Sequence, residues 1–413
     1  MITLVKNIQT LVNVRENHSL LRGKALSELP CIQDAYLLIE NDIILNYGKM
    51  EDLENNQSVS PNNIIDATHQ HVLPTWCDSH THLVFAGSRE NEFVDKIKGL
   101  TYTEIAANGG GILHSAEKVN NASVEELFES AWKRLQEIIQ HGTGAVEIKS
   151  GYGLSVDAEI KMLRVIKLLK EKSPIPIKST FLAAHTFPLI YKDNHQGYID
   201  LIIQQMLPII EKEKLADYVD VFCENGFFSV NEMEQICNAA IRMGLKPKLH
   251  VNQIHSIGAL QKAISLDALS VDHLETMTEK DIDDLANSNT IGTLLPSAAF
   301  FLRMQYQPAR AIVDAGAAIA LASDYNPGSS PSGNMNFVIS LACIQMKLLP
   351  EEAINAATLN AAYAMGMDHQ LGSISVGKKA NLIFTKKIPS LAYFPYSFGS
   401  NLIEKVMISG EIF

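Results

Sequence analysis

The pattern of hydrophobic and polar positions divides the chain into two strand-rich ends and a long middle. Near the N-terminus, β-rich runs over residues 35–40 and 43–47 flank Asn41-Asp42, which is a hairpin signal. Near the C-terminus, residues 381–384 and 406–408 form short strands. Because neither end has enough strands for a stable sheet by itself, the pattern predicts that the two ends together form one small β-sandwich.

The middle of the chain alternates strands with helices, which is typical of parallel βα units. Residues 123–139 carry an apolar stripe at helical spacing, and Ser123 with Glu126 predicts a capping box at its start. The same signal recurs at Ser229 and Glu232 before a second apolar stripe. Helices are therefore expected to follow the strands regularly.

Strands of this middle region are expected at eight places: 77–82, 146–149, 179–184, 219–223, 249–252, 270–274, 292–295 and 319–323. Eight strand–helix repeats predict an α/β fold, a (β/α)8 TIM-like barrel over residues 72–369, with residues 1–71 and 370–413 as a composite β-sandwich domain. An open doubly wound sheet is the alternative, but it normally has a glycine-rich phosphate turn after its first strand, where this chain has histidines.

Composition narrows the class of protein. The chain has 413 residues, 46% hydrophobic and 19% charged, the balance of a globular protein. A net charge of -12 argues against binding to nucleic acid or to an anionic membrane surface. The five cysteines are widely spaced, without a CxxC motif, and no apolar stretch reaches the ~20 residues of a membrane span. The start also lacks the apolar core of a signal peptide, so a cytoplasmic protein is expected.

A pair of histidines at the end of the first barrel strand is the first candidate for chemistry. His80 and His82 lie two residues apart, so they share one face of the strand and could bind the same metal ion. One such pair is weak evidence, because His69 and His71 have the same spacing. Those two precede the barrel, and we expect them at the surface.

Three further strand ends carry residues that bind metals. His250 ends the fifth strand, His273 the sixth and Asp324 the eighth. Together with His80 and His82 they predict a metal site, whereas each alone could be a hydrogen-bonded core residue or a helix cap. Imidazoles with one carboxylate suit zinc or iron rather than calcium or magnesium. Such a metal activates water, for which Asp324 could accept the proton, while His273 could hydrogen-bond the attacked oxygen.

Longer motifs around these positions resemble those of the imidazolonepropionase family within the amidohydrolase superfamily. The HxH motif is general to the superfamily, whereas four other runs are narrower: Ser88-Arg89-Glu90, Gly109-Gly110-Gly111, Lys149-Ser150-Gly151-Tyr152-Gly153-Leu154 and Asp324-Tyr325-Asn326-Pro327-Gly328. The similarity runs through nearly the full chain, including both ends.

The resemblance implies hydrolysis of 4-imidazolone-5-propanoate to N-formimidoyl-L-glutamate in histidine degradation, with one zinc or iron ion per subunit and a homodimer. The implied metal ligands are His80, His82, His250 and Asp324. The implied substrate-binding residues are Arg89, Tyr152, His185, Gln253, Asn326, Gly328 and Ser329. Arg89 offers a bidentate fork for the carboxylate of this small anion.

Some positions depart from the family or leave alternatives open. Thr75 stands where the superfamily usually has glycine, and Gln253 where some members have a glutamate that could act as a base. Lys149 is not expected to be a carbamylated metal ligand. The segment from Leu100 to Gly111 is expected to be a lid that brings Tyr102 to the substrate, with a flexible connector as the alternative.

Other functions are compatible with the same metal site. A nucleobase deaminase or another cyclic amidohydrolase would need the same metal and water. A non-catalytic relative would use the barrel only for assembly, but such proteins usually lose metal ligands, and here all of them are present.

Overall fold

A closed ring of parallel strands forms the centre of the molecule. The computed structural model describes residues 1–16, 19–53, 60–100, 104 and 110–413. The ring strands are β6 (Trp76–Thr81), β7 (Thr143–Lys149), β8 (Ile177–Ala184), β9 (Tyr218–Cys223), β10 (Lys246–Val251), β11 (Ser270–His273), β12 (Ile291–Leu294) and β13 (Ile319–Leu321). Neighbours in the sheet are neighbours in the sequence, so the order never reverses as it would in a doubly wound sheet. The eight predicted strands are confirmed.

Backbone hydrogen bonds close this ring between its last and first strands. The N–H of Asp324 donates to the carbonyl of His80 at 3.0 Å, and the N–H of His82 donates to the carbonyl of Tyr325 at 2.9 Å. Closure therefore occurs at the carboxyl ends of β6 and β13, and it sets the HxH pair beside the aspartate that follows the eighth strand.

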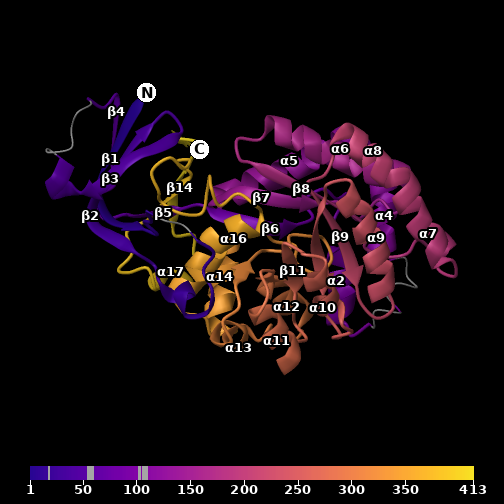
Figure 1. Cartoon of the computed structure of the whole chain (residues 1–413). Helices are drawn as coiled ribbons and strands as arrows, with labels where there is room; N and C mark the ends of the chain where they lie inside the picture. Colours follow the sequence, from indigo (N-terminus) through magenta and orange to yellow (C-terminus); the bar gives the residue numbers. More distant parts are fainter. Residues whose placement is uncertain (17–18, 54–59, 101–103, 105–109) are drawn as a thin grey trace.

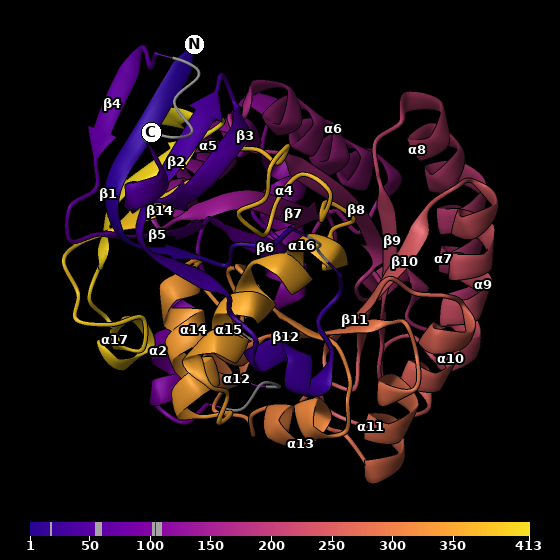
Figure 2. The same cartoon turned by 60° about the vertical axis from the view of Figure 1, so that its left-hand side comes forward.

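Helices surround the ring, as Figures 1 and 2 show from two directions. They are α2 (Glu90–Ile97), α4 (Ile112–Asn121), α5 (Val124–Gln140), α6 (Val156–Lys172), α7 (His195–Leu201), α8 (Leu207–Glu213), α9 (Val230–Arg242), α10 (Ala259–Ser265), α11 (Glu279–Ala286), α12 (Pro296–Leu302), α13 (Ala309–Asp314), α14 (Met335–Ile344), α15 (Pro350–Ala357) and α16 (Leu359–Ala364). Both predicted capping boxes are present, at Ser123 and Ser229, and begin α5 and α9. These caps satisfy N–H groups that the first helical turn leaves without partners.

The two ends of the chain join in one mixed sheet beside the barrel, and both termini lie on this side of the molecule (Figure 1). Its strands are β1 (Ile2–Val12), β2 (Cys31–Glu40), β3 (Ile43–Lys49), β4 (Asn63–Asp66), β5 (His71–Pro74), β14 (Leu382–Thr385), β15 (Ile403–Ile408) and β16 (Glu411–Ile412). Strand β5 pairs with β1 on one side and with β14 on the other, so N- and C-terminal strands share one hydrogen-bonded ladder. The predicted pairing of the ends is thus present as a continuous sheet, with a core from both ends that includes Val5, Leu37 and Phe384.

The junction between this sheet and the barrel corrects one prediction. His69 is exposed as expected, but His71 is buried in β5, where its N–H donates to the hydroxyl of Thr385 at 3.0 Å. The surface prediction for His71 was wrong because β5 lies between two other strands. Thr75, which stands where the superfamily usually has glycine, is accommodated by Gly144, since a Cβ there would lie 1.9 Å from the Thr75 hydroxyl.

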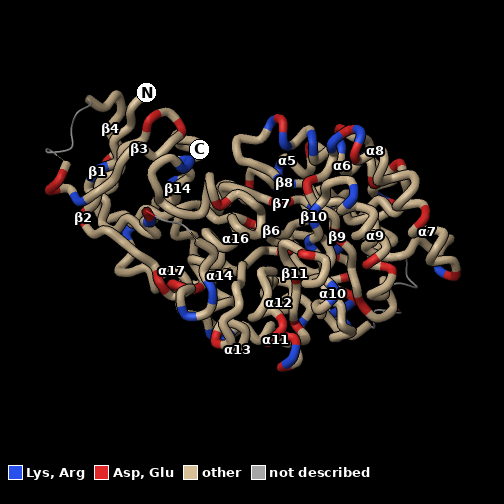
Figure 3. Tube along the Cα trace, in the orientation of Figure 1, with Lys and Arg blue, Asp and Glu red and all other residues tan. Residues whose placement is uncertain are grey.

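Acidic and basic residues are interspersed along the outer helices and turns (Figure 3). In the part of the chain that the structure describes, no helix combines the length and the apolar character needed to cross a bilayer.

Candidate metal centre and substrate cavity

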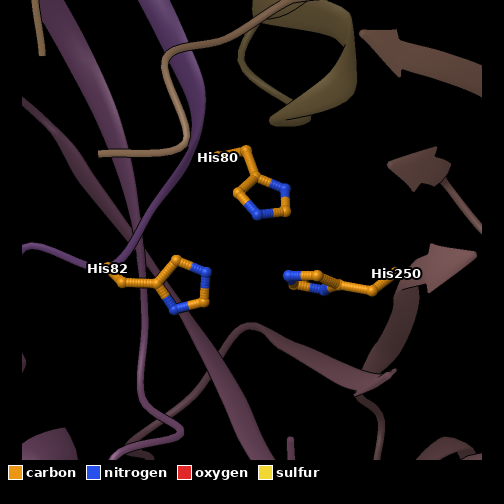
Figure 4. A group of neighbouring side chains, drawn as sticks. All are labelled: His80, His82 and His250. Atoms are coloured by element: carbon orange, nitrogen blue, oxygen red, sulfur yellow. The ribbon is translucent and has the colours of Figure 1, made fainter. Parts of the chain in front are cut away.

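Three buried histidines converge at the carboxyl ends of the barrel strands. His80 and His82 come from β6, and His250 comes from β10. Each offers a ring nitrogen, and these atoms lie within 4.8 Å of one another. Figure 4 shows the three rings directing nitrogen atoms toward a common space. The structure thus brings together the three histidines that the sequence predicted as metal ligands.

Two buried aspartates orient these rings from the side opposite the common space. The carboxylate of Asp272 lies 2.7 Å from Nδ1 of His80, and that of Asp220 lies 2.7 Å from Nδ1 of His250. A carboxylate at Nδ1 favours the tautomer with hydrogen on that atom and leaves Nε2 with a lone pair. Both histidines therefore present the nitrogen that a metal ion requires.

Lys149 lies beneath these aspartates as a buried cation. Its Nζ is 2.9 Å from Asp220, 3.4 Å from Asp272 and 2.8 Å from Glu147. Burial alone would lower the pKa of Lys149, but the three carboxylates outweigh it and raise the pKa above its ordinary value. Lys149 is thus an ion-paired ammonium beneath the aspartates, and that it is not a carbamylated ligand stays a prediction.

The electrostatics of the site fit a bound cation. Burial, and next the charge of Lys149, holds the pKa of His80 well below its ordinary value. Burial, and next the charge of His185, does the same for His82. Both rings are therefore neutral and can each offer a nitrogen lone pair to a metal ion. Nε2 of His80 is buried without a hydrogen-bond partner among the described residues. A buried polar atom of this kind is costly unless something binds it. Three imidazoles that converge on one space are a typical zinc-binding set.

Asp324 and His273 lie next to this triad. Oδ1 of Asp324 is 3.5 Å from Nε2 of His80 and 3.6 Å from Nε2 of His82, and the hydroxyl of Ser329 donates to Oδ2 at 3.2 Å. Burial raises the pKa of Asp324, a cost that a neighbouring cation would offset. The His273 ring centroid is 5.1 Å from that of His250, and Nδ1 of His273 lies 3.2 Å from the carboxylate of Glu275. Burial lowers the pKa of His273, but the charge of Glu275 outweighs burial and raises the pKa above its ordinary value.

A cavity of about 690 Å³ opens beside the triad. Seven of the eight predicted substrate-binding residues line it, namely Arg89, Tyr152, His185, Gln253, Asn326, Gly328 and Ser329. The eighth, Tyr102, lies outside the described residues, as does most of the predicted lid. Two of the lining rings adjoin a triad histidine: the centroids of Tyr152 and His185 are 5.7 and 5.3 Å from that of His82. The cavity therefore adjoins the metal centre through the rings of Tyr152 and His185.

The loop after β13 holds one wall of the cavity. The side-chain oxygen of Asn326 accepts the N–H groups of Gly328 and Ser329, each at 2.8 Å, and its amide donates to the Ser329 hydroxyl at 2.7 Å. Gly328 lies against Arg89, because a Cβ at Gly328 would be 2.3 Å from Nη1 of the guanidinium. This loop thus connects Asp324 to the residue that is predicted to bind the substrate's carboxylate.

Two polar residues of the cavity, His185 and Tyr152, are uncharged. Burial, followed by the charge of His250, lowers the pKa of His185 to about 3, so this imidazole is neutral at physiological pH. Its Nδ1 lies 3.2 Å from the carbonyl of Gly151, which leaves the other ring nitrogen for a ligand. Burial raises the pKa of Tyr152, so the phenol keeps its hydrogen and can donate it.

The sequence analysis missed the two aspartates of this site and the ion pairs that Lys149 makes with them. Asp220, Asp272 and Lys149 are all fully buried charges on barrel strands, and that is the signal that could have indicated the network. Charged residues in otherwise apolar strands are costly unless paired, so three of them on the alternate strands β7, β9 and β11 indicate an internal network. The apolar wall of the cavity, which includes Phe222 and Phe301, carries no comparable signal.

A closed (β/α)8 barrel with a histidine metal centre at the carboxyl ends of its strands defines a metal-dependent hydrolase. The family model described as "Amidohydrolase family" matches residues 71–413, and the chain belongs to this family. Within it, the chain groups with the imidazolonepropionases, as the sequence motifs predicted. It is 58% identical to the imidazolonepropionase of Flavobacterium johnsoniae over 413 residues, with 100% of each chain covered.

A more distant relative agrees with this assignment, and solved structures share the fold. The imidazolonepropionase of Fusobacterium nucleatum is 43% identical over 408 residues, covering 98% of this chain and 97% of the relative. An adenosine deaminase from Xanthomonas campestris with bound zinc has a TM-score of 0.74 at 16% identity, covering 99% of this chain and 92% of that one. Guanine deaminase from E. coli also has a TM-score of 0.74, at 13% identity and with 100% and 99% covered. At such low identity, these structures support the fold alone.

Proposed function

We propose that this chain hydrolyses 4-imidazolone-5-propanoate to N-formimidoyl-L-glutamate in histidine degradation. The observation that carries the proposal is that one cavity beside the histidine triad is lined by Arg89, Tyr152, His185, Gln253, Asn326, Gly328 and Ser329. Full-length identity of 58% to an imidazolonepropionase supports the same substrate. We assign the chemistry to the barrel, residues 72–369, and treat residues 1–71 and 370–413 as a separate small domain.

Three histidines and one carboxylate would hold the metal, which we propose to be one zinc or iron ion per subunit. The ligands are His80, His82, His250 and Asp324, whose Oδ1 lies near Nε2 of both β6 histidines. When bound, this ion supplies a Lewis acid that lowers the pKa of a water molecule to about 7. Asp220, Asp272 and Lys149 hold the imidazoles in the required orientation.

The residues around the metal centre move the protons of the reaction. The oxygen of water adds to the ring carbonyl carbon, the C–N bond breaks, and the water proton passes to the departing nitrogen. We assign this transfer to Asp324, whose Oδ2 is held by Ser329 while Oδ1 faces the histidines. His273, tied at Nδ1 to Glu275, offers Nε2 to the attacked oxygen or to the proton. Gln253 can bind the ring but cannot act as a base.

The cavity wall binds and orients the substrate. Neutral His185 and the hydroxyl of Tyr152 can hydrogen-bond the polar ring, and Arg89 can bind the carboxylate. Glu92 already accepts hydrogen bonds from Nε and Nη2 of Arg89, at 2.9 and 2.7 Å. The carboxylate is therefore expected at the side of the guanidinium that carries Nη1, next to Gly328. We further propose that Tyr102 contacts the substrate, and that the protein is a cytoplasmic homodimer.

Product analysis separates this proposal from a nucleobase deaminase or another cyclic amidohydrolase. Metal-loaded protein would be incubated in parallel with 4-imidazolone-5-propanoate, with adenine, guanine and cytosine, and with hydantoin as a cyclic amide. Mass spectrometry would detect formimidoylglutamate, and an ammonia assay would report deamination. Formimidoylglutamate from the first substrate alone supports the proposal, whereas turnover of a nucleobase or of hydantoin in its place would overturn it. No turnover of any substrate by metal-loaded protein would favour the non-catalytic alternative.

A further inference from the structure

The charged residues of α2 that lie at the cavity carry a net positive charge. Arg89 is bound to the carboxylate of Glu92, so this pair carries no net charge. Lys96 lies on the same helix, α2, and lines the same cavity. Among the described residues, Lys96 takes part in no ion pair, and its one hydrogen bond is a long one, 3.5 Å from Nζ to the carbonyl of Gly328. The excess positive charge beside Arg89 therefore belongs to Lys96.

The surroundings of Lys96 favour an anion in the cavity. The side chain is half-buried, with Nζ 5.8 Å from the ring centroid of Phe301. Burial, together with the charge of Arg89, lowers the pKa of Lys96, so the free protein holds this ammonium at a cost. An ammonium has three hydrogens to donate, and the described residues accept only one long bond from it. An anion between Lys96 and Arg89 would supply the missing acceptor.

Because the chain as a whole is acidic, an anionic substrate gains from a cation inside the cavity. A net charge of -12 repels small anions at long range. Arg303 also lines the cavity, but it is exposed, so water screens its charge. Lys96 is the less exposed of these two cations, and its charge is correspondingly less screened within the cavity.

We propose that Lys96 is a specificity-determining residue, a second cation that binds the substrate's carboxylate together with Arg89. In this arrangement Arg89, held by Glu92, fixes the direction of the carboxylate, and Lys96 supplies the net charge that selects an anionic ring over a neutral one. The inference rests on the proposed function, because it names the part of the substrate that this end of the cavity recognises.

The test compares Lys96→Met with Lys98→Met as a matched control. Lys98 caps the C-terminal end of α2, is exposed and does not line the cavity, so both variants lose one positive charge but only one loses it at the site. Calorimetry on metal-loaded protein would measure the Kd of imidazole-4-propanoate, an unreactive anionic analogue. We expect Lys96→Met to raise this Kd about tenfold and Lys98→Met less than about twofold. Lys96→Arg keeps the charge and should remain within about threefold of the wild type.

A neutral ligand checks that the effect depends on charge. The methyl ester of the same analogue should bind the wild type and Lys96→Met equally well. Equal Kd values for the anion in Lys96→Met and Lys98→Met would overturn the inference, as would an equal loss of ester binding or no binding of the anion by the wild type. Because binding requires no turnover, a wild type that binds the anion but does not hydrolyse 4-imidazolone-5-propanoate would refute the proposed function alone.

Discussion

Replacing Gly328 by alanine tests whether close contact with Arg89 sets substrate binding. The backbone of Gly328 does not lie in the left-handed region, so alanine introduces no backbone strain, but its Cβ would lie 2.3 Å from Nη1 of Arg89. The guanidinium must withdraw by about 1 Å to reach ordinary van der Waals distance. Since the end of an arginine side chain can move, the fold should tolerate the change, with less than ~1 kcal/mol lost from the free energy of unfolding.

The expected cost falls on substrate binding. A displacement of about 1 Å in a group that binds a carboxylate can cost up to ~100-fold, so we expect KM to rise about 10- to 100-fold while metal content stays unchanged. Steady-state kinetics with 4-imidazolone-5-propanoate, urea unfolding and metal analysis would measure the three quantities separately.

A double-mutant cycle with Arg89→Ala shows whether the effect passes through the guanidinium. If it does, the double variant will bind substrate no worse than Arg89→Ala alone, because the group that Gly328→Ala displaces is already absent. The reasoning fails if Gly328→Ala leaves KM at the wild-type value in a folded protein. It also fails if the two substitutions have additive effects.

Three further predictions concern stability and use urea unfolding. Lys149→Met removes the cation that Asp220, Asp272 and Glu147 share, and among the described residues only Glu147 stays paired with another lysine, Lys248. The change should cost about 3–5 kcal/mol, so a cost below ~1 kcal/mol would contradict the network described above. Ser123→Ala removes the N-cap of α5 and should cost about 1 kcal/mol with an unchanged KM; a rise in KM would mean that the cap affects the site. In α11, hydrogen bonds from Gln261 and Thr278 outweigh burial and lower the pKa of Asp281, so its contribution is complete above about pH 4 and is lost as the pH falls through the folded-state pKa. The stability difference between the wild type and Asp281→Asn should therefore be smaller at pH 3.5 than at pH 7, and a larger difference at pH 3.5 would reverse the assigned sign.

Much of the fold follows from local sequence signals. The hairpin at Asn41-Asp42 and the caps at Ser123 and Ser229 depend on a few adjacent residues, and all are present in the structure. The eight barrel strands were predictable because apolar runs alternate with amphipathic helices along the chain. His71 was placed wrongly, because its burial depends on a strand more than 300 residues later, at Thr385.

Site residues at the ends of strands were predictable from the sequence. Contacts between residues of different segments were less so. His80, His82 and His250 come together because closure of the barrel gathers the carboxyl ends of its strands. Arg89 and Glu92 form an i,i+3 pair at the start of α2, which helical spacing could have indicated, whereas the approach of Gly328 to Arg89 depends on how two loops meet. Local patterns carry no information about such contacts, so the charge balance at the cavity required the structure.

Metal-dependent hydrolysis is the central claim, and metal titration tests it most directly. Protein stripped by a chelator would receive increasing zinc or, in parallel, ferrous iron, while the ultraviolet absorbance of 4-imidazolone-5-propanoate is followed. We predict no decay in the stripped protein, recovery that reaches a plateau at one ion per chain, and no recovery in His80→Ala at that ratio. Full activity in protein shown to be free of metal, or in metal-free His80→Ala, would contradict the account.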